Sequence, residues 1–278
     1  MRHLLWLVPL LAACGPAAFD PIQPFDPGWV KVFEDSFDGP AGSAPDPAVW
    51  TPDTGAGGWG NDELQNYTDR PDNLRLSGNG TLLIVAHREA YEGSDWTSAR
   101  IQTLGLLGRT YGAFEARMKL PAGKGLWPAF WLLGNDVFTS GWPLCGEVDV
   151  MEMQGEAPQT VFQTLHGPGY AGAASVGDAT TLPQGTFADD FHTFRVEIDP
   201  EYIAWFIDDD LVARHVPGDL PDGAPWVFDH PMFMLLNLAV GGTFVQAPDA
   251  STPDEAVLEV DDVKVFERAT DPTDTGAP

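Results

Sequence analysis

The sequence is poor in cysteine and in positive charge. Only two cysteines, Cys14 and Cys145, occur in 278 residues. A folded domain that begins after Cys14 contains only Cys145, so no disulfide can form within it. Lysine and arginine number 14 against 41 acidic residues, a net charge of −27. Because phosphate binding relies on clusters of Lys and Arg, this excludes nucleic acid as an expected partner and leaves neutral substrates unaffected. Solubility in a salty habitat is the other explanation of the acidic excess.

Long apolar runs are scarce as well. The apolar run at residues 4–11 is too short to span a membrane, and it follows a basic residue as in an export signal. It leads into Leu11-Ala12-Ala13-Cys14, which resembles the bacterial lipobox, where the chain is cut before a cysteine that becomes lipid-modified. We expect a signal peptide at 1–13, a lipid on Cys14, and an exported lipoprotein of the outer membrane or cell surface. The alternative is an ordinary secretory signal with an incidental cysteine, giving a periplasmic or secreted protein.

The composition indicates one folded domain between two short flanks. Residues 14–27 contain four prolines and have the composition of a spacer. Residues 269–278 have no apolar pattern and are expected to be disordered. The domain therefore spans 28–268, and its tryptophans and a hydrophobic content of 44% suffice for a sizeable core. We expect it to be a monomer that meets the membrane only through the lipid.

Long helical periodicity is missing too, whereas short strand-like runs recur between turn signals. Residues 114–119 alternate apolar and charged side chains, and an Asp-rich turn at 208–210 predicts a hairpin. Many strands without long helices indicate an all-β sandwich of two antiparallel sheets. The expected strands are residues 30–33, 74–76, 82–87, 111–119, 129–133, 147–153, 161–166, 191–198, 202–207, 211–215, 232–240 and 257–266.

Three carboxylates stand close together at 147–152, within an apolar, β-branched segment. In a regular strand Glu147 and Asp149 share a face, and Glu152 points the opposite way. One extra residue in a β-bulge restores the parity and leaves Glu147 and Glu152 effectively four positions apart, roughly 13 Å between Cα atoms. Inward-leaning side chains then bring the carboxyl groups to roughly 5 Å, as in a retaining glycosidase, although the inverting spacing stays open. The alternative is that these acids lie on a solvent-exposed face of a strand and have no catalytic role.

Aromatic and polar residues can furnish a cleft around these acids. Trp127 and Trp131 are four positions apart, so on a strand they share a face where rings can stack on sugars and indole N–H groups can bind hydroxyls. Core packing is the alternative. Asn61 and Glu63 could present polar groups to hydroxyls or merely form a turn. Cys145 could touch the cleft floor, but a small apolar filler is the simpler interpretation, and no histidine partner for a nucleophile is evident.

These segments carry a family resemblance. The stretches GWGNDELQNYT (58–68), TSARIQT (97–103), YGAFEARMKLPAGKGLWPAFWLLG (111–134), GWPLCGEVDVMEMQG (141–155), TLHGPGY (164–170) and FDHPMFMLLNLAVGG (228–242) resemble the bacterial laminarinase-like enzymes of glycoside hydrolase family 16. The E-x-D-x-x-E form resembles the 1,3-β-glucanase branch, since the lichenase branch uses E-x-D-x-E. The resemblance implies a concanavalin-like β-jelly roll and a retaining, endo-acting hydrolase of laminarin-type 1,3-β-glucan. Mixed-linkage β-glucan cleavage, transglycosylation or non-catalytic glucan binding are the alternatives.

The resemblance also implies roles for single residues. Glu147 would be the nucleophile, Glu152 the general acid/base and Asp149 the assisting carboxylate. The implied sugar-binding residues are Trp127, Trp131, Asn61, Glu63, Arg100 and His166, with a structural role left open for His166. The chemistry implied needs no cofactor.

Two further features follow from the resemblance. Relatives often bind a structural calcium ion, for which Asp261, a carbonyl near Gly80 and Glu34 would be the ligands; oxygen ligands suit Ca²⁺. The family often has a Trp after the Gly241-Gly242 pair, whereas this chain has Thr243-Phe244. We therefore expect the loop at 243–252 to shape a different subsite.

Overall fold

The computed structural model describes residues 28–269; the expected signal peptide, Cys14, the expected spacer and most of the C-terminal tail lie outside them. The strands are β1 (Trp29–Asp35), β2 (Thr51–Asp53), β3 (Gln65–Tyr67), β4 (Leu74–Leu76), β5 (Leu82–His87), β6 (Trp96–Ser98), β7 (Arg100–Gln102), β8 (Gly108–Arg109), β9 (Gly112–Lys119), β10 (Leu126–Gly134), β11 (Glu147–Met153), β12 (Thr160–His166), β13 (Val176–Thr181), β14 (His192–Ile198), β15 (Ile203–Ile207), β16 (Asp210–His215), β17 (Met232–Val240) and β18 (Glu255–Arg268). The short helices are α1 (Val137–Ser140), η1 (Gly172–Ala174) and η2 (Pro217–Asp219). Among the described residues no helix has the length and apolar character needed to cross a membrane.

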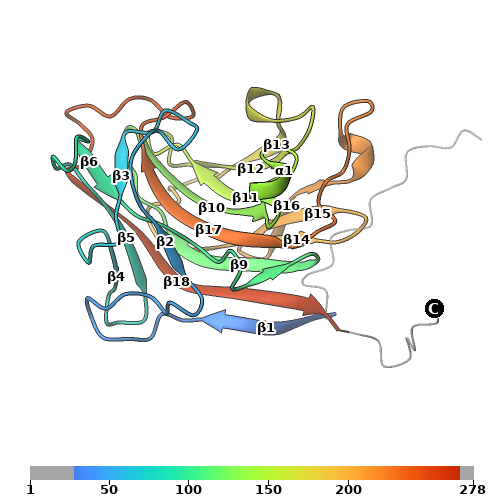
Figure 1. Cartoon of the computed structure of the whole chain (residues 1–278), viewed down its shortest axis with the longest axis horizontal. Coiled ribbons are helices and arrows are strands. Elements are labelled where there is room, and N and C mark those ends of the chain that lie inside the picture. The colour runs from blue at the N-terminus through green and yellow to red at the C-terminus, as the bar shows by residue number, and fades with distance from the viewer. Residues whose placement is uncertain (1–27, 270–278) are drawn as a thin grey trace, which may run out of the picture.

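The strands form two stacked sheets (Figure 1). The eight-stranded sheet has the order β13-β12-β11-β10-β17-β7-β2, with β8 beside β17, and is named the cleft sheet. The ten-stranded outer sheet has the order β16-β15-β14-β9-β18-β5-β6-β3. In addition, β1 pairs with β18 and β4 pairs with β5. The expected sandwich of two sheets is confirmed. One detail differs, because β3 and β6 pair in parallel.

Alternating side chains explain how β9 sits in the outer sheet. Phe114 and Met118 enter the main core, which lies between the two sheets. Glu115, on the opposite face, is 3.3 Å from the Nζ atom of Lys264 and 3.5 Å from a guanidinium nitrogen of Arg195. The alternation at 114–119 therefore separates core from outer face, as predicted. The hairpin is also confirmed, and positive φ angles at Asp208 (50°) and Asp209 (69°) match the tight turn that joins β15 to β16.

The expected strands all appear, but several short ones were not predicted. These are β2, β3, β6, β7, β8 and β13. Three-residue strands show too little alternation to be recognised, and the exposed strand β13 has almost no apolar residues.

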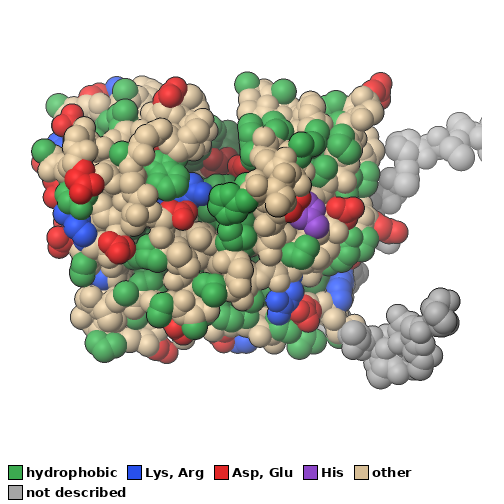
Figure 2. Space-filling model, viewed as in Figure 1, with side chains coloured by type: hydrophobic (Ala, Val, Ile, Leu, Met, Phe, Trp, Pro, Cys, Tyr) green, Lys and Arg blue, Asp and Glu red, His purple; other side chains and the backbone are tan. Residues whose placement is uncertain are grey.

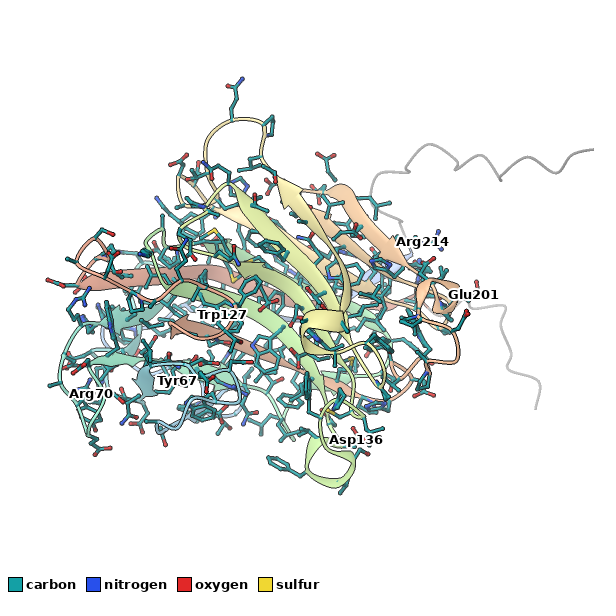
Figure 3. The ribbon with its side chains drawn as sticks, turned by 90° about the horizontal axis from the view of Figure 1, so that it is seen from above. Tyr67, Arg70, Trp127, Asp136, Glu201 and Arg214 are labelled. Carbon is teal, nitrogen blue, oxygen red and sulfur yellow. The ribbon has the colours of Figure 1, made fainter. Side chains whose placement is uncertain are left out.

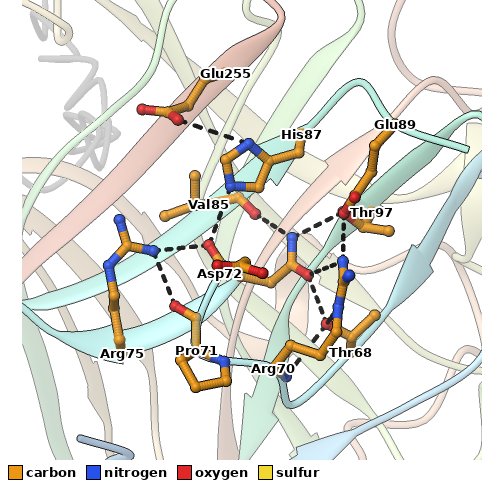
Figure 4. A network of polar contacts seen from close by, with 11 residues as sticks. Thr68, Arg70, Pro71, Asp72, Arg75, Val85, His87, Glu89, Thr97 and Glu255 are labelled. Atoms are coloured by element: carbon orange, nitrogen blue, oxygen red, sulfur yellow. Dashed lines mark hydrogen bonds and ion pairs between the residues drawn. The ribbon is translucent and has the colours of Figure 1, made fainter. Parts of the chain in front are cut away.

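Polar side chains fix the short strands at one end of the outer sheet. The buried Asn73 amide donates to the Val85 carbonyl and to the Thr97 hydroxyl, both at 2.9 Å, and accepts from Thr68 at 2.6 Å. Arg70 joins this network and pairs with Glu89 (Figure 4). Buried hydrogen bonds of this kind add to the apolar contacts that hold β4, β5 and β6 together.

Candidate active site

The three acidic side chains of β11 lie on one face because the strand carries a bulge. Two consecutive residues of β10 face Asp149 and Met151, which leaves Val150 without a partner. The pairing with β12 shifts between Asp149 and Glu152 as well. Val150 and Met151 are both buried in the core, whereas Glu147, Asp149 and Glu152 line a common cavity. The predicted bulge is confirmed.

The bulge also sets the spacing of the two glutamates. Glu147 and Glu152 face Leu133 and Ala129 of β10, which are four residues apart. The predicted separation of four positions is therefore confirmed, and at about 3.3 Å per residue it corresponds to roughly 13 Å between Cα atoms. Both side chains reach into one cavity of about 780 Å³. Figure 2 shows a hollow with acidic side chains at its base.

The cavity brings all six predicted sugar-binding residues together with the acids. Apart from the acids, it is lined by Trp59, Gly60, Asn61, Glu63, Arg100, Trp127, Ala129, Trp131, Leu133, Trp142, Thr164, His166, Gly172, Ala173, Ser175, Asn237, Thr243 and Phe244. The cavity has the size of a pocket for a sugar oligomer, and it is rich in aromatic rings and polar groups.

Burial in the cleft floor shifts all three acids in the same direction. It raises the pKa of Glu147 to about 8, helped by the charge of Asp149 and opposed by His166 and by the Trp142 hydrogen bond. Burial likewise raises the pKa of Asp149 to about 7, while a hydrogen bond with Glu147 lowers it. The pKa of Glu152 is raised well above its ordinary value, first by burial and then by the charges of Asp149 and Glu147. Glu152 is therefore the acid best suited to hold a proton at neutral pH.

His166 is fixed between the backbone and Asp149. Its Nδ1 accepts the backbone N–H of Gly172 at 3.1 Å, so the neutral ring carries its proton on Nε2. That Nε2 lies 3.1 Å from Oδ2 of Asp149, and Asp149 is almost fully buried. His166 thus lines the cavity and also has partners within the protein. Both the sugar-binding role and the structural role that the sequence left open are compatible with this position.

The same geometry bears on metal binding. Ligand atoms of Glu147, Asp149 and His166 lie within 4.8 Å of one another, the kind of cluster that can hold a metal ion. A metal-binding imidazole must offer a lone pair, but here the nitrogen near the carboxylates carries the proton as long as Gly172 donates to the other one. The cluster is therefore better suited to proton chemistry than to a metal.

The two predicted tryptophans share a face, but their N–H groups are already used. Trp127 donates to Oε1 of Glu152 at 2.9 Å, and Trp131 donates to Oδ1 of Asn237 at 2.8 Å. Both indole N–H groups thus have acceptors within the protein, and sugar binding by these two residues stays a prediction. Trp127 lies over the cleft sheet in Figure 3.

A chain of polar contacts forms the wall near Trp131. Glu63 accepts from Asn61 at 3.3 Å, from Gln65 at 2.6 Å and from the Tyr67 hydroxyl at 3.1 Å. The Tyr67 hydroxyl accepts in turn from Asn237 at 3.2 Å. Because Asn237 also accepts from Trp131, these contacts link the wall to the aromatic floor.

Arg100 lies between two aromatic rings. Its guanidinium carbon is 5.0 Å from the ring centroid of Trp59 and 4.8 Å from that of Trp131, and its Nε lies 2.9 Å from Oδ2 of Asp53. The guanidinium thus stabilises the position of both rings in addition to lining the cavity.

The loop at 243–252 packs against the side of the cavity that holds Glu152. Phe244 lies 5.2 Å from the Trp127 ring and 5.2 Å from the Phe162 ring. Its carbonyl accepts from the Gln154 side chain at 2.6 Å, and Thr243 N–H donates to the Asn61 carbonyl at 2.8 Å. Thr243 and Phe244 line the cavity, so the loop does shape the cleft.

Sequence reasoning missed several residues of the cavity. Asn237 could have been suspected, because it is the one polar residue of the apolar strand β17. Trp59 stands in the polar loop that supplied Asn61, and Trp142 lies only five residues before Glu147. Cys145 does not line the cavity; it is fully buried among apolar side chains, in agreement with the simpler interpretation.

The calcium ligands predicted from the resemblance have other partners. Oδ2 of Asp261 lies 2.6 Å from a guanidinium nitrogen of Arg117, and Glu34 pairs with Lys31. A calcium ion here would compete with these cationic partners for the two carboxylates. Calcium at this place stays a prediction.

Comparison with known proteins agrees with the geometry. Residues 60–263 match the family model described as glycosyl hydrolases family 16. A "Beta-glucanase" of Rhodothermus marinus is 40% identical over 252 residues, covering 88% of this chain and 86% of its own. A "Glucan endo-1,3-beta-glucosidase" of Cryptopygus antarcticus is 38% identical over 233 residues, covering 78% of this chain and 82% of its own.

Solved structures show the same architecture. The laminarinase catalytic domain of Thermotoga maritima MSB8 superposes with a TM-score of 0.82 at 42% identity, over 87% of this chain and 99% of that domain. The predicted jelly-roll sandwich is thereby confirmed.

Proposed function

The chain belongs to glycosyl hydrolase family 16, and on that premise we propose that its cleft cleaves 1,3-β-glucan chains internally, with retention of anomeric configuration. The relatives named above act on β-glucan. The cavity is lined by aromatic rings and polar side chains, the groups that bind a neutral sugar. No cofactor is needed, since the carboxyl groups supply every proton and the nucleophile.

In the first step Glu147 attacks the anomeric carbon while Glu152 gives its proton to the glycosidic oxygen. The C–O bond breaks, one part of the glucan leaves with a free hydroxyl group, and the other stays esterified to Glu147. Asp149 shares a hydrogen bond with Glu147 and is held near His166, so it orients the nucleophile.

In the second step Glu152, now ionised, takes a proton from water as the water attacks the same carbon. Loss of negative charge on Glu147 in the ester lowers the pKa of Glu152, which lets it act as the base. The Glu147 ester breaks, and the carboxylate and protonated Glu152 are restored.

The observation that carries this proposal is the bulge at Val150, which directs the side chains of Glu147 and Glu152 into the same cavity. Glu147→Gln and Glu152→Gln should each reduce laminarin hydrolysis by at least about a thousandfold, while the circular dichroism spectrum and the Tm measured at about pH 5 stay close to wild type. Glu255→Gln, at an exposed position on the outer sheet, is the matched control and should be fully active. Full activity of either cleft variant refutes the assignment.

The loop around Phe244 lines the cavity and departs from the family pattern, so a second candidate function concerns a different linkage or acceptor. On this reading the same acids cut mixed-linkage β-glucan or transfer glycosyl units to sugars. Product analysis on laminarin, barley-type glucan and agarose separates these activities. Oligosaccharides longer than the substrate would reveal transfer.

We propose further that the enzyme is exported and anchored through a lipid on Cys14, as the lipobox-like sequence suggests. A Cys14→Ser variant should move from the membrane fraction to the soluble fraction, and mass spectrometry should find the lipid only on the wild type. A wild type that is soluble and carries an unmodified Cys14 would favour the ordinary secretory signal.

A further inference from the structure

A hydrogen bond crosses the core from the outer sheet to the catalytic strand. The indole Nε1 of Trp205, in β15, donates to the backbone carbonyl of Asp149 at 2.9 Å. Trp205 is fully buried and does not line the cavity. The bond therefore reaches the backbone of the active site from the side away from any substrate.

The acceptor lies where the strand departs from regular pairing. In a regular sheet, carbonyl groups point along the sheet toward neighbouring strands. A carbonyl that meets a side chain of the opposite sheet has turned out of that plane. On both sides of β11 the register break begins directly after Asp149, which is where a bulge rotates the backbone. Trp205 thus donates to the peptide group that starts the bulge.

The surroundings of Trp205 hold its ring in place. The pairing of β15 with β16 also shifts register at Trp205, so this residue stands beside a second irregularity. The His215 ring packs on it edge to face, 5.7 Å away at 80°. Nε2 of His215 lies 3.0 Å from Oδ2 of Asp178 in β13, the edge strand of the cleft sheet. Full burial and the His215 contact leave the indole little freedom to rotate away from Asp149.

We propose that Trp205 is a positioning residue for catalysis, whose N–H group holds the Asp149–Val150 peptide in the orientation that places Glu147 and Glu152 on one face. This inference rests on the proposed function, because it concerns the geometry of the catalytic pair. Without the donor a buried carbonyl loses its partner, and the backbone can relax toward regular pairing. Regular pairing turns Glu152 away from the cleft.

The test compares two buried tryptophans in the full chain. Trp205→Phe removes the N–H and keeps most of the ring volume. Trp50→Phe is the matched control, since Trp50 is 1% exposed and its indole donates to Asp35 at 2.9 Å, outside the cavity. Both variants lose one indole hydrogen bond, so both should lower Tm.

Only Trp205→Phe should alter catalysis. We expect its kcat on laminarin to fall at least about tenfold with KM changed less than about threefold, because small displacements of reacting groups cost rate more than binding. Both limbs of its pH–rate profile should move to lower pH, since a loosened bulge admits water to carboxyl groups whose pKa values burial raises. Trp50→Phe should keep the wild-type kcat and profile.

Two results overturn the inference: a Trp205→Phe enzyme with wild-type kcat and pH profile, or losses of activity in both variants that simply follow their Tm. If Trp205→Phe does not fold, replacement of Trp205 by benzothienylalanine, in which sulfur takes the place of the N–H, makes the same test with an isosteric ring. Failure of the proposed function itself looks different, because then the wild type does not cleave laminarin or Glu147→Gln remains active.

Discussion

The indole nitrogen of Trp142 donates to Oε2 of Glu147 at 2.7 Å, although half of the Trp142 side chain is exposed to solvent. The ring also lies 6.0 Å from that of His166. A residue at the rim of the cavity thus donates a hydrogen bond to the proposed nucleophile. Asp136 and α1, just before Trp142 in the chain, project from the end of the strands (Figure 3).

Trp142→Phe should shift the acidic limb of the profile of kcat/KM against pH. The hydrogen bond favours the ionised form of Glu147 and lowers its pKa, so its loss raises that pKa. The nucleophile must be ionised, and the acidic limb therefore moves to higher pH, by about half a unit. Trp226→Phe, outside the cavity, is the control and should leave both limbs in place. An unchanged acidic limb in Trp142→Phe would show that the bond does not form in solution.

Phe244→Ala should weaken proton donation. Phe244 packs on the Trp127 ring, which donates to Glu152, so a gap at 244 frees the group that orients the acid. The kcat for laminarin should fall about tenfold, whereas an aryl glycoside with an acidic phenol, which needs little protonation, should lose less. Phe244→Trp should retain activity on both substrates.

Phe138→Ala is the matched control for that experiment, because Phe138 is 86% exposed and lies outside the cavity. Equal losses on both substrates in Phe244→Ala would contradict a role in proton donation. A higher KM with unchanged kcat would instead indicate a direct sugar contact.

Because burial raises the pKa values of the cleft carboxyl groups, the folded protein should become less stable as pH increases. The pKa of Glu147 is about 8 in the fold, above its value in an unfolded chain. Between about pH 4.5 and pH 8 the folded state therefore holds protons that the unfolded state has lost, and the free energy of unfolding falls through this window. Glu152→Gln removes one raised acid, so at pH 8 its Tm should exceed that of wild type by about 2–4 °C. Calorimetry at pH 5 and pH 8 measures this, and Glu255→Gln should keep the wild-type dependence.

Cys145 should not react with thiol reagents in the native protein. It is fully buried, and burial raises the pKa of its thiol to about 11, so little thiolate forms. In a Cys14→Ser background, Ellman's reagent should modify Cys145 only after unfolding in guanidinium chloride. Rapid modification of the native enzyme with loss of activity would place this thiol at the cleft after all.

The calcium prediction can be tested because Asp261 already has a partner. A calcium ion bound there would compete with Arg117 for the carboxylate and stabilise the fold, so Tm should rise with Ca²⁺ and fall with EDTA. Arg117→Ala removes the competitor and should enlarge that difference. Equal Tm values with calcium and with EDTA, in both wild type and variant, would dismiss the site.

The catalytic segment was predictable from sequence because its evidence is local. The side-chain period of a strand and an acid at the wrong parity were enough to predict the bulge between Asp149 and Glu152. The spacing of Trp127 and Trp131 predicted their common face in the same way. Such inferences need only a few neighbouring residues and one geometric rule.

The hydrogen-bond partners were not predictable, because they depend on pairing between distant segments. Nothing in the sequence relates Trp205 to Asp149, 56 residues earlier, or Asn237 to Tyr67, 170 residues earlier. The two indoles of β10 were expected to face substrate, yet folding gave each an acceptor within the protein. Polar groups at the edge of a core find partners in the final packing, which local patterns do not encode.

The irregular pairing in β11 means that segment length matters more than residue type there. Swapping Val150 or Met151 for other apolar side chains keeps the count, and with it the direction of Glu152, whereas deleting one codon would rotate every following side chain by half a turn. Libraries for directed evolution should therefore vary composition across this stretch at fixed length.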